Sequence, residues 1–180
     1  MNLFNQLKTL EDFRRKQGQL HKLPMVLIIV IMSYMSGHFG QRAVGDFIKR
    51  NEKDLLKLFN PKNKRLPSYQ TVARILKNID FKKFSKVFYE WSKNYIKIEK
   101  EDWISIDGKA IGGTVTNPNS SKQRFINLVS IFNSKTKQII ALGKVNNKNS
   151  EISLVQSLIK KLDLENVVFT LDALHCQKKL

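Results

Sequence analysis

The chain has little of what marks secreted or membrane-spanning proteins. It holds one cysteine, Cys176, among 180 residues, so no internal disulfide can form, which is typical of a reducing cytoplasm. Its longest apolar run, residues 23–35, has 13 residues, whereas a membrane-spanning helix needs about 20. The chain also starts without a basic segment ahead of an apolar one. We therefore expect a cytoplasmic protein with no signal peptide and no membrane anchor.

Acidic residues are scarce as well. The chain carries 15 Asp and Glu against 32 Lys and Arg, a net charge of +17. Residues 1–100 hold 21 basic and 8 acidic side chains, whereas residues 101–180 hold 11 and 7. A regional excess of positive charge is typical of a domain that meets a polyanion, so we expect nucleic acid as the partner. The alternative is a Lys-rich composition that serves solubility alone.

The first half of the chain shows helical periodicity throughout. We expect a short amphipathic helix at 5–16, a fully apolar core helix at 23–35 and one or two helices within 41–59. A capped helix should follow Ser68, and a last helix at 81–95 carries aromatic residues on one face, which we assign to the core.

Basic residues lie mostly off the apolar stripes of the last two helices. Arg74, Lys82 and Lys83 are examples, and such a solvated basic face suits contacts with DNA phosphates, which position DNA without reading its sequence. Periodicity alone does not decide whether a helix-turn-helix is present.

Two stretches of the second half have the same form. In residues 103–109, apolar and β-branched residues lead to Asp107, and Gly108 follows at once. Residues 167–172 repeat the pattern and end at Asp172. Each is typical of a buried strand that ends in an aspartate, with Gly108 letting the chain turn away.

The segments between these two strands predict the topology. Glycine, proline, asparagine and serine at 112–123 predict a loop, and the helix expected at 151–162 has an apolar stripe. Two further strands, at 124–132 and 138–145, complete a meander with the first, giving the order β-β-β-α-β. A crossover helix then makes the first and fourth strands parallel.

This topology brings three carboxylates to one edge of the sheet. Asp107 and Asp172 end parallel strands, and Glu151 starts the helix at the same side. Carboxylate oxygens suit Mg²⁺ or Mn²⁺, which can activate water against a phosphodiester. The alternative is that the aspartates are turn residues and that Glu151 is a favourable acid at a helix dipole. Spacing alone leaves both interpretations open.

Four motifs, in this order, resemble DDE transposases of bacterial insertion sequences, of the H-repeat-associated type. They are P-S-Y-Q-T-V-A-R at 67–74, I-S-I-D-G-K at 104–109, N-S-E-I at 149–152 and T-L-D-A-L-H-C-Q at 170–177. The resemblance spans nearly the whole chain. It implies an α + α/β protein, with an all-helical DNA-binding domain at 1–98 and an incomplete RNase H-like catalytic portion at 99–180.

The resemblance also implies roles for individual residues. Asp107 and Asp172 match the family's first two catalytic, metal-holding aspartates, and Lys109 and Gln177 become candidate DNA contacts beside Arg74, Lys82 and Lys83. In RNase H enzymes an acid at the start of the first helix joins the metal site, a role open to Glu151. The reaction would be Mg²⁺-dependent cleavage and transfer of DNA strands at the element's terminal repeats, by a homo-oligomer when intact.

Two departures qualify this expectation. The family's third acid, a glutamate, lies further downstream than Leu180, so we expect a C-terminally truncated member with impaired activity. Gly112 and Gly113 stand near where the family has an arginine-bearing turn. A non-catalytic DNA-binding remnant that regulates transposition is the main alternative function, and an RNA-directed nuclease is another.

Overall fold

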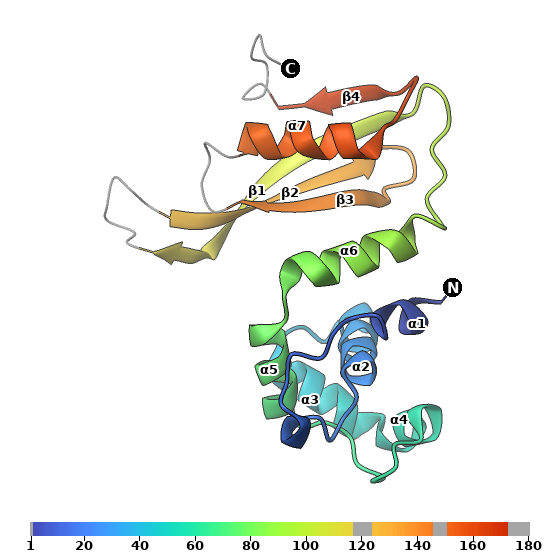
Figure 1. Cartoon of the computed structure of the whole chain (residues 1–180), viewed down its shortest axis with the longest axis vertical. Helices are drawn as coiled ribbons and strands as arrows, with labels where there is room; N and C mark the ends of the chain where they lie inside the picture. The colour runs from blue at the N-terminus through green and yellow to red at the C-terminus, as the bar shows by residue number, and fades with distance from the viewer. Residues whose placement is uncertain (1, 117–123, 146–150, 173–180) are drawn as a thin grey trace. The chain divides into compact units, whose positions relative to one another are not determined.

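A computed structural model describes residues 2–116, 124–145 and 151–172 of the chain, which divides into two compact units, Met1–Trp91 and Ser92–Leu180 (Figure 1). The helices that precede the sheet are α1 (Leu3–Leu7), the 3-10 helix η1 (Lys16–Gly18), α2 (Leu23–Met35), α3 (Gln41–Arg50), α4 (Glu52–Phe59), α5 (Tyr69–Asn78) and α6 (Phe81–Ser92). The first unit is therefore helical, as the periodicity of the sequence predicts.

Helix α2 is the centre of the first unit. Seven of its residues are buried, and the six apolar ones form one core cluster with residues of α1, α3, α4 and α5. By length and composition the segment Lys16–Met35 could cross a membrane, but the core helix of a globular unit passes the same test. The break at residues 19–22 leaves α2 with 13 residues. The prediction of a buried core helix at 23–35 is confirmed.

The helix predicted at 5–16 is wrong beyond Leu7. Helix α1 ends at Leu7, and Thr9 closes it by donating from Oγ1 to the Gln6 carbonyl at 2.7 Å. The following segment is held by Arg14 instead of by helical bonds, because its guanidinium bonds both the Asp12 carboxylate and backbone carbonyls. The Arg14 side chain is therefore part of the packed structure of this unit.

The prediction for the aromatic helix is partly wrong. Helix α6 ends at Ser92, and none of its residues is fully buried. Phe84 and Val87 pack against the helical core. The half-buried rings of Phe88 and Trp91 contact each other with centroids 5.2 Å apart and planes tilted by 58°. The aromatic stripe therefore covers the core from outside instead of forming it.

The second unit contains a four-stranded sheet with the order β3-β2-β1-β4. Its elements are β1 (Trp103–Thr116), β2 (Arg124–Asn133), β3 (Ile139–Val145), α7 (Glu151–Leu162) and β4 (Val168–Leu171). The pairs β1–β2 and β2–β3 are antiparallel, whereas β1–β4 is parallel. The predicted meander, crossover helix and parallel fourth strand are thus confirmed.

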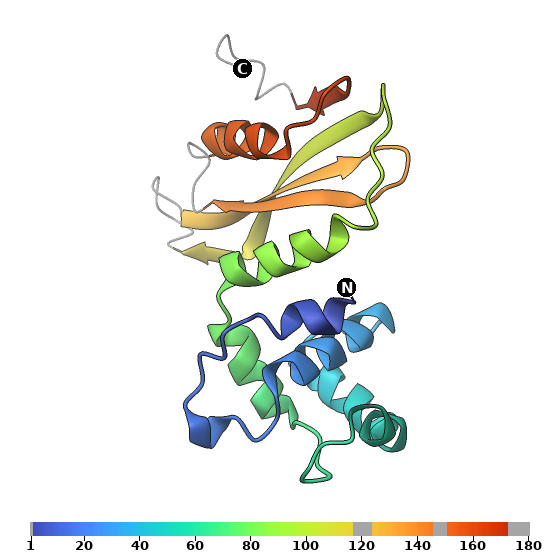
Figure 2. The ribbon, with the colours of Figure 1, turned by 45° about the vertical axis from the view of Figure 1, so that its right-hand side comes forward.

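Helix α7 covers one face of this sheet (Figure 2). Its buried Val155 belongs to one core cluster with Ile104 and Ile106 of β1 and Val129 and Ile131 of β2. Because successive side chains of a strand point to opposite faces, Ser105, Asp107 and Lys109 of β1 lie on the other face. The pleat of β1 therefore decides which side chains lie beneath the helix.

Strand β1 is longer than the sequence predicts. It continues past Gly108 to Thr116 and pairs with β2 through Ile111 and again at Thr116, with an irregularity between. The loop predicted at 112–123 is thus wrong for residues 112–116, and residues 117–123 lie outside the described part of the chain. Gly108 does not turn the chain away, and its role must be sought in what packs against it.

Candidate functional site

The two aspartates lie beside each other in register. The parallel pairing of β1 with β4 runs to Ile106 and Leu171, and Asp107 and Asp172 are the next residues on each chain. Both aspartates are exposed. Since β1 continues, Asp107 lies within the strand beside the place where β4 ends. The sheet therefore positions two carboxylates next to each other, as the sequence predicts.

Glu151 lies against the neighbouring residue, Gly108. A Cβ atom at position 108 would overlap Glu151 Oε1 and lie 3.0 Å from its Cδ atom, so only glycine leaves room for this carboxylate. Glu151 is the first residue of α7, which fixes its approach to β1. Gly108 is therefore needed to make room for the Glu151 carboxylate. The sequence alone attributes this glycine to a turn.

Asn127 holds the same carboxylate from the adjacent strand. Its Nδ2 donates to Glu151 Oε2 at 3.1 Å, and its side chain is buried with 3% of its surface exposed. Asn127 pairs with Ala110, two residues along β1 from Gly108. Sequence reasoning missed this residue, because only the register of β1 with β2 brings it to Glu151.

The three acids do not form a metal cluster in the described residues. In the ranges 2–116, 124–145 and 151–172, no group of three or more His, Cys, Asp or Glu side chains could hold a metal ion. The pleat explains this, because Asp107 faces away from α7 whereas Glu151 reaches β1 from the α7 side. Glu151 thus approaches Asp107 from the opposite face of the sheet.

The donor atoms nevertheless suit a hard divalent cation. Asp107 and Asp172 offer carboxylate oxygens from neighbouring positions, and Mg²⁺ and Mn²⁺ take oxygen ligands. Asn127 Oδ1 is a buried acceptor with no hydrogen-bond partner, close to the Glu151 carboxylate. Buried polar atoms are normally paired. This oxygen lies on the α7 side with Glu151, so it does not belong to the pair of carboxylates that Asp107 and Asp172 present on the other face.

A hydrogen-bond network around the buried Asp102 fixes the N-terminal start of β1, before the strand reaches Asp107. Asp102 accepts hydrogen bonds from the Glu99 N–H at 2.9 Å and from Asn133 Nδ2 at 2.7 Å. Its own carbonyl accepts from the Val168 N–H, which ties β4 to β1. The backbone hydrogen bond from Glu99 lowers the pKa of Asp102 below its ordinary value of 3.8. This network sets the alignment of β1 with β4.

The predicted DNA contacts differ in their surroundings. Arg74, Lys82 and Lys109 are exposed. Lys83 is also exposed, but its Nζ lies 3.1 Å from Glu11 Oε2. Gln177 lies outside the described residues, as do His175, Cys176 and the first half of the N-S-E-I motif. The contact with Glu11 makes Lys83 the least available of these cations.

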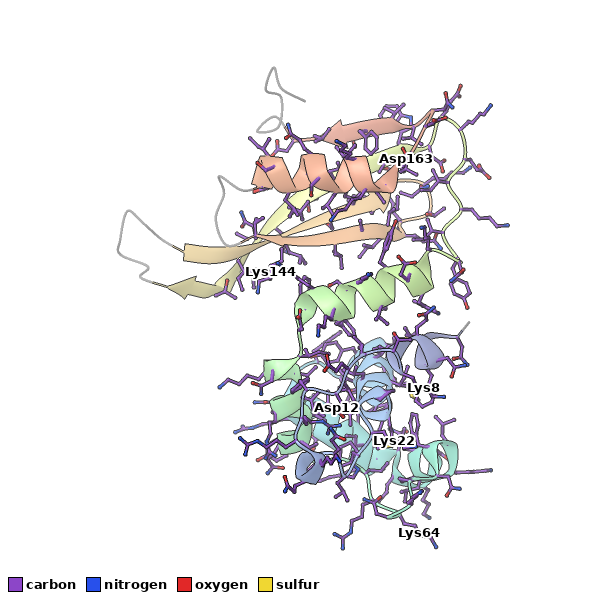
Figure 3. All side chains as sticks on the ribbon, viewed as in Figure 1. Lys8, Asp12, Lys22, Lys64, Lys144 and Asp163 are labelled. Carbon is purple, nitrogen blue, oxygen red and sulfur yellow. The ribbon has the colours of Figure 1, made fainter. Side chains whose placement is uncertain are left out.

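A lysine that the sequence did not single out joins Lys109. Lys109 pairs with Leu128, which pairs with Lys144 of β3, so both lysines share a row across the face opposite α7. Lys144 is exposed on that face (Figure 3). The face that presents Asp107 therefore also presents two cations.

Comparison with known proteins finds one family model and several relatives that this chain resembles. Residues 4–92 match the family model described as DDE_Tnp_1-associated. The chain is 28% identical over 179 residues to "Putative transposase YncI" of Escherichia coli O157:H7, which covers 99% of this chain and 45% of the relative. It is also 28% identical over 178 residues to "H repeat-associated putative transposase YhhI" of Escherichia coli K12, covering 99% and 46%.

A third relative is shorter. "H repeat-associated putative transposase YbfD" of Escherichia coli K12 is 28% identical over 178 residues, with 99% of this chain and 69% of the relative covered. The chain spans about half the length of YncI of the O157:H7 strain and of YhhI. Residues 4–92 therefore match the DDE_Tnp_1-associated domain, and nearly the whole chain is similar to H repeat-associated putative transposases.

Proposed function

We propose that this chain acts in DNA transposition, with the helical unit binding DNA and the second unit cutting a DNA strand with the help of divalent cations. The observation that carries the proposal is the parallel pairing of β1 with β4, which puts Asp107 and Asp172 side by side. The names of the relatives, which are putative transposases, support the same process. The β3-β2-β1-β4 order with its crossover helix suits an RNase H-like domain.

Each residue of the site would have a distinct part. Asp107 and Asp172 would hold Mg²⁺ or Mn²⁺ on the face away from α7. Asn127 holds Glu151 on the α7 side, so this acid would supply a third carboxylate only after its side chain moves towards the two aspartates. Bound divalent cations activate a water or 3′-hydroxyl and stabilise the leaving oxygen of a phosphodiester. Lys109 and Lys144 would hold the DNA backbone on the face that presents Asp107.

Metal-dependent nicking of supercoiled plasmid and of element-end DNA tests this proposal. We expect nicking with Mg²⁺ or Mn²⁺ that disappears in Asp107→Asn and in Glu151→Gln. Asp163→Asn is the matched control, since Asp163 is an exposed carboxylate just past the far end of α7 from Glu151 (Figure 3). Nicking that persists in Asp107→Asn, or that survives removal of metal by a chelator, would overturn the catalytic proposal.

A second candidate function is DNA binding without chemistry. It is favoured by the absence, in the described residues, of three acids gathered as a metal group. Such a chain would occupy DNA ends and regulate transposition through its basic helical unit. Salt-sensitive DNA binding with no metal-dependent nicking would support this role. The expected homo-oligomer and cytoplasmic location stay predictions for either function.

A further inference from the structure

Helix α5 has a rigidly held inner face and a polar outer stripe. Val72 and Ile75 are buried at 0% and 1% exposure and belong to the helical core. Gln70, Arg74 and Lys77 follow one another at i, i+4 and i+7, and all three are exposed. This spacing puts them on one stripe that faces away from the core.

Helix α3 supports α5 at very short range. A Cβ atom at Gly45 would lie 2.8 Å from Tyr69 Cβ, so the missing side chain lets the start of α5 pack directly on the middle of α3. Ser68 caps α5 by accepting a hydrogen bond from the Thr71 N–H at 3.4 Å. The first turns of α5 are thereby fixed in place, with Tyr69 and Gln70 exposed.

The sequence around α5 contains no acid. Between Asp54 and Asp80 there are six basic residues and no Asp or Glu. Three of the six, Lys62, Lys64 and Arg65, are exposed on the loop that leads into α5, where Figure 3 labels Lys64. That loop is ordered by bonds from the Lys64 N–H to the Pro61 carbonyl and from the Arg65 N–H to Asn63 Oδ1.

We propose that α5 is the helix that reads base edges in the major groove of duplex DNA. Gln and Arg side chains form paired hydrogen bonds with adenine and guanine in that groove, which admits an α-helix. The cations at 62–65 would hold the flanking phosphates, and α3, on which the start of α5 packs, would hold α5 in position. Duplex RNA does not fit, because its major groove is too narrow for side chains to read.

This inference rests on the proposed DNA binding by the helical unit and adds sequence selectivity to it. Selection of preferred sequences from a random duplex pool with the full chain would supply a preferred site. Fluorescence anisotropy would then compare the affinity for that site with the affinity for a scrambled duplex. The comparison would be made for the parent chain, Gln70→Ala, Arg74→Ala and Arg50→Ala.

Arg50→Ala is the charge-matched control, because Arg50 is exposed in the last turn of α3 and is not on α5. We expect Gln70→Ala and Arg74→Ala each to reduce the preference for the selected site about tenfold. Arg50→Ala should leave the preference for the selected site unchanged. Replacing the guanines of the site by 7-deazaguanine should weaken the parent chain but not Arg74→Ala, because the variant no longer contacts N7.

The outcomes separate this inference from the proposed function. A selected site whose preference survives both α5 variants would overturn the role of α5 while leaving DNA binding intact. DNA binding with no sequence preference would likewise overturn the role of α5 and leave the proposed DNA binding intact. No binding to any DNA, or preferential binding to RNA, would overturn both proposals.

Discussion

At the scale of single residues, Gly108 decides where Glu151 lies. A Cβ atom at this position would overlap Glu151 Oε1, which is the end of a flexible side chain. We predict that Gly108→Ala keeps the fold but displaces the carboxylate from Asn127. The lost hydrogen bond should cost about 1 kcal/mol of unfolding free energy, measured by urea denaturation.

The double variant Gly108→Ala/Glu151→Ala provides the control for this prediction. Without the Glu151 carboxylate the added methyl group has no atom to displace, so Gly108→Ala should cost little in the Glu151→Ala background. Equal costs in both backgrounds would mean that Gly108 is required for another reason. Metal-dependent nicking by Gly108→Ala should be lost along with the position of Glu151.

The lowered pKa of Asp102 predicts how the stability of the fold depends on pH. Its pKa is lowered in the folded chain, chiefly by the Glu99 N–H, so the ionised form is the one that the fold stabilises. This stabilisation is complete above the unfolded pKa, near 3.8, and is lost as the pH falls through the folded pKa. We predict that thermal stability between pH 5 and about pH 2 falls more steeply in the parent chain than in Asp102→Asn.

Trp103 adjoins Asp102, so its fluorescence in a Trp91→Phe background reports on this unit. In the other unit, burial lowers the pKa of His21 below the ordinary His value of 6.5. Protonation of this histidine in acid therefore also reduces the stability of the fold. Both variants retain His21, so the difference between their pH profiles isolates Asp102. Parallel profiles would show that the carboxylate does not stabilise the sheet in its ionised form.

At the scale of elements, hydrogen bonds from the Arg14 side chain hold the segment in which the sequence predicts a helix. Its guanidinium bonds Asp12 at 2.6 Å and the carbonyls of Gly18 and His21, and the side chain is 8% exposed. We predict that Arg14→Ala lowers the unfolding free energy by about 2 kcal/mol, because a half-buried carboxylate and backbone carbonyls lose their partner. Urea denaturation followed by circular dichroism measures this loss.

The adjacent Arg15 offers a control of identical chemistry. Arg15 is exposed and makes no side-chain capping bond at η1, so Arg15→Ala should change stability by less than about 0.5 kcal/mol. Arg14→Lys should recover only part of the loss, since an ammonium group cannot reproduce the planar, forked contact. Similar losses for Arg14→Ala and Arg15→Ala would disprove the special role of Arg14.

The elements also show what a sequence can and cannot predict. Apolar periodicity predicted α2, α7 and the order of the four strands, since it reflects which face each element buries. It failed at residues 8–16, where side-chain bonds from Arg14 outweigh helical spacing. It placed Asp107 beside Asp172 but missed that Glu151 approaches from the opposite face. It also missed Asn127 and the bond between Asp102 and Asn133. Those contacts depend on the register between distant strands.

At the scale of the whole molecule, the positive charge is spread unevenly over the two units. The first unit, Met1–Trp91, holds 18 basic and 7 acidic residues, whereas the second holds 14 and 8. Binding to DNA phosphates releases counterions, so affinity falls with salt in proportion to the number of phosphate contacts. The salt dependence of the full chain therefore reports which cations meet DNA.

We predict that replacing Lys62, Lys64 and Arg65 by glutamine lowers the slope of log affinity against log salt by up to about 3, close to 0.9 for each lost contact. The matched triple replaces Lys49, Arg50 and Lys53, which are also exposed and carry the same charge. If only the total charge attracts DNA, the two triples will have equal slopes. If the loop before α5 meets the phosphates, only the first triple will flatten the slope, and its sequence preference will be unchanged because Gln70 and Arg74 remain.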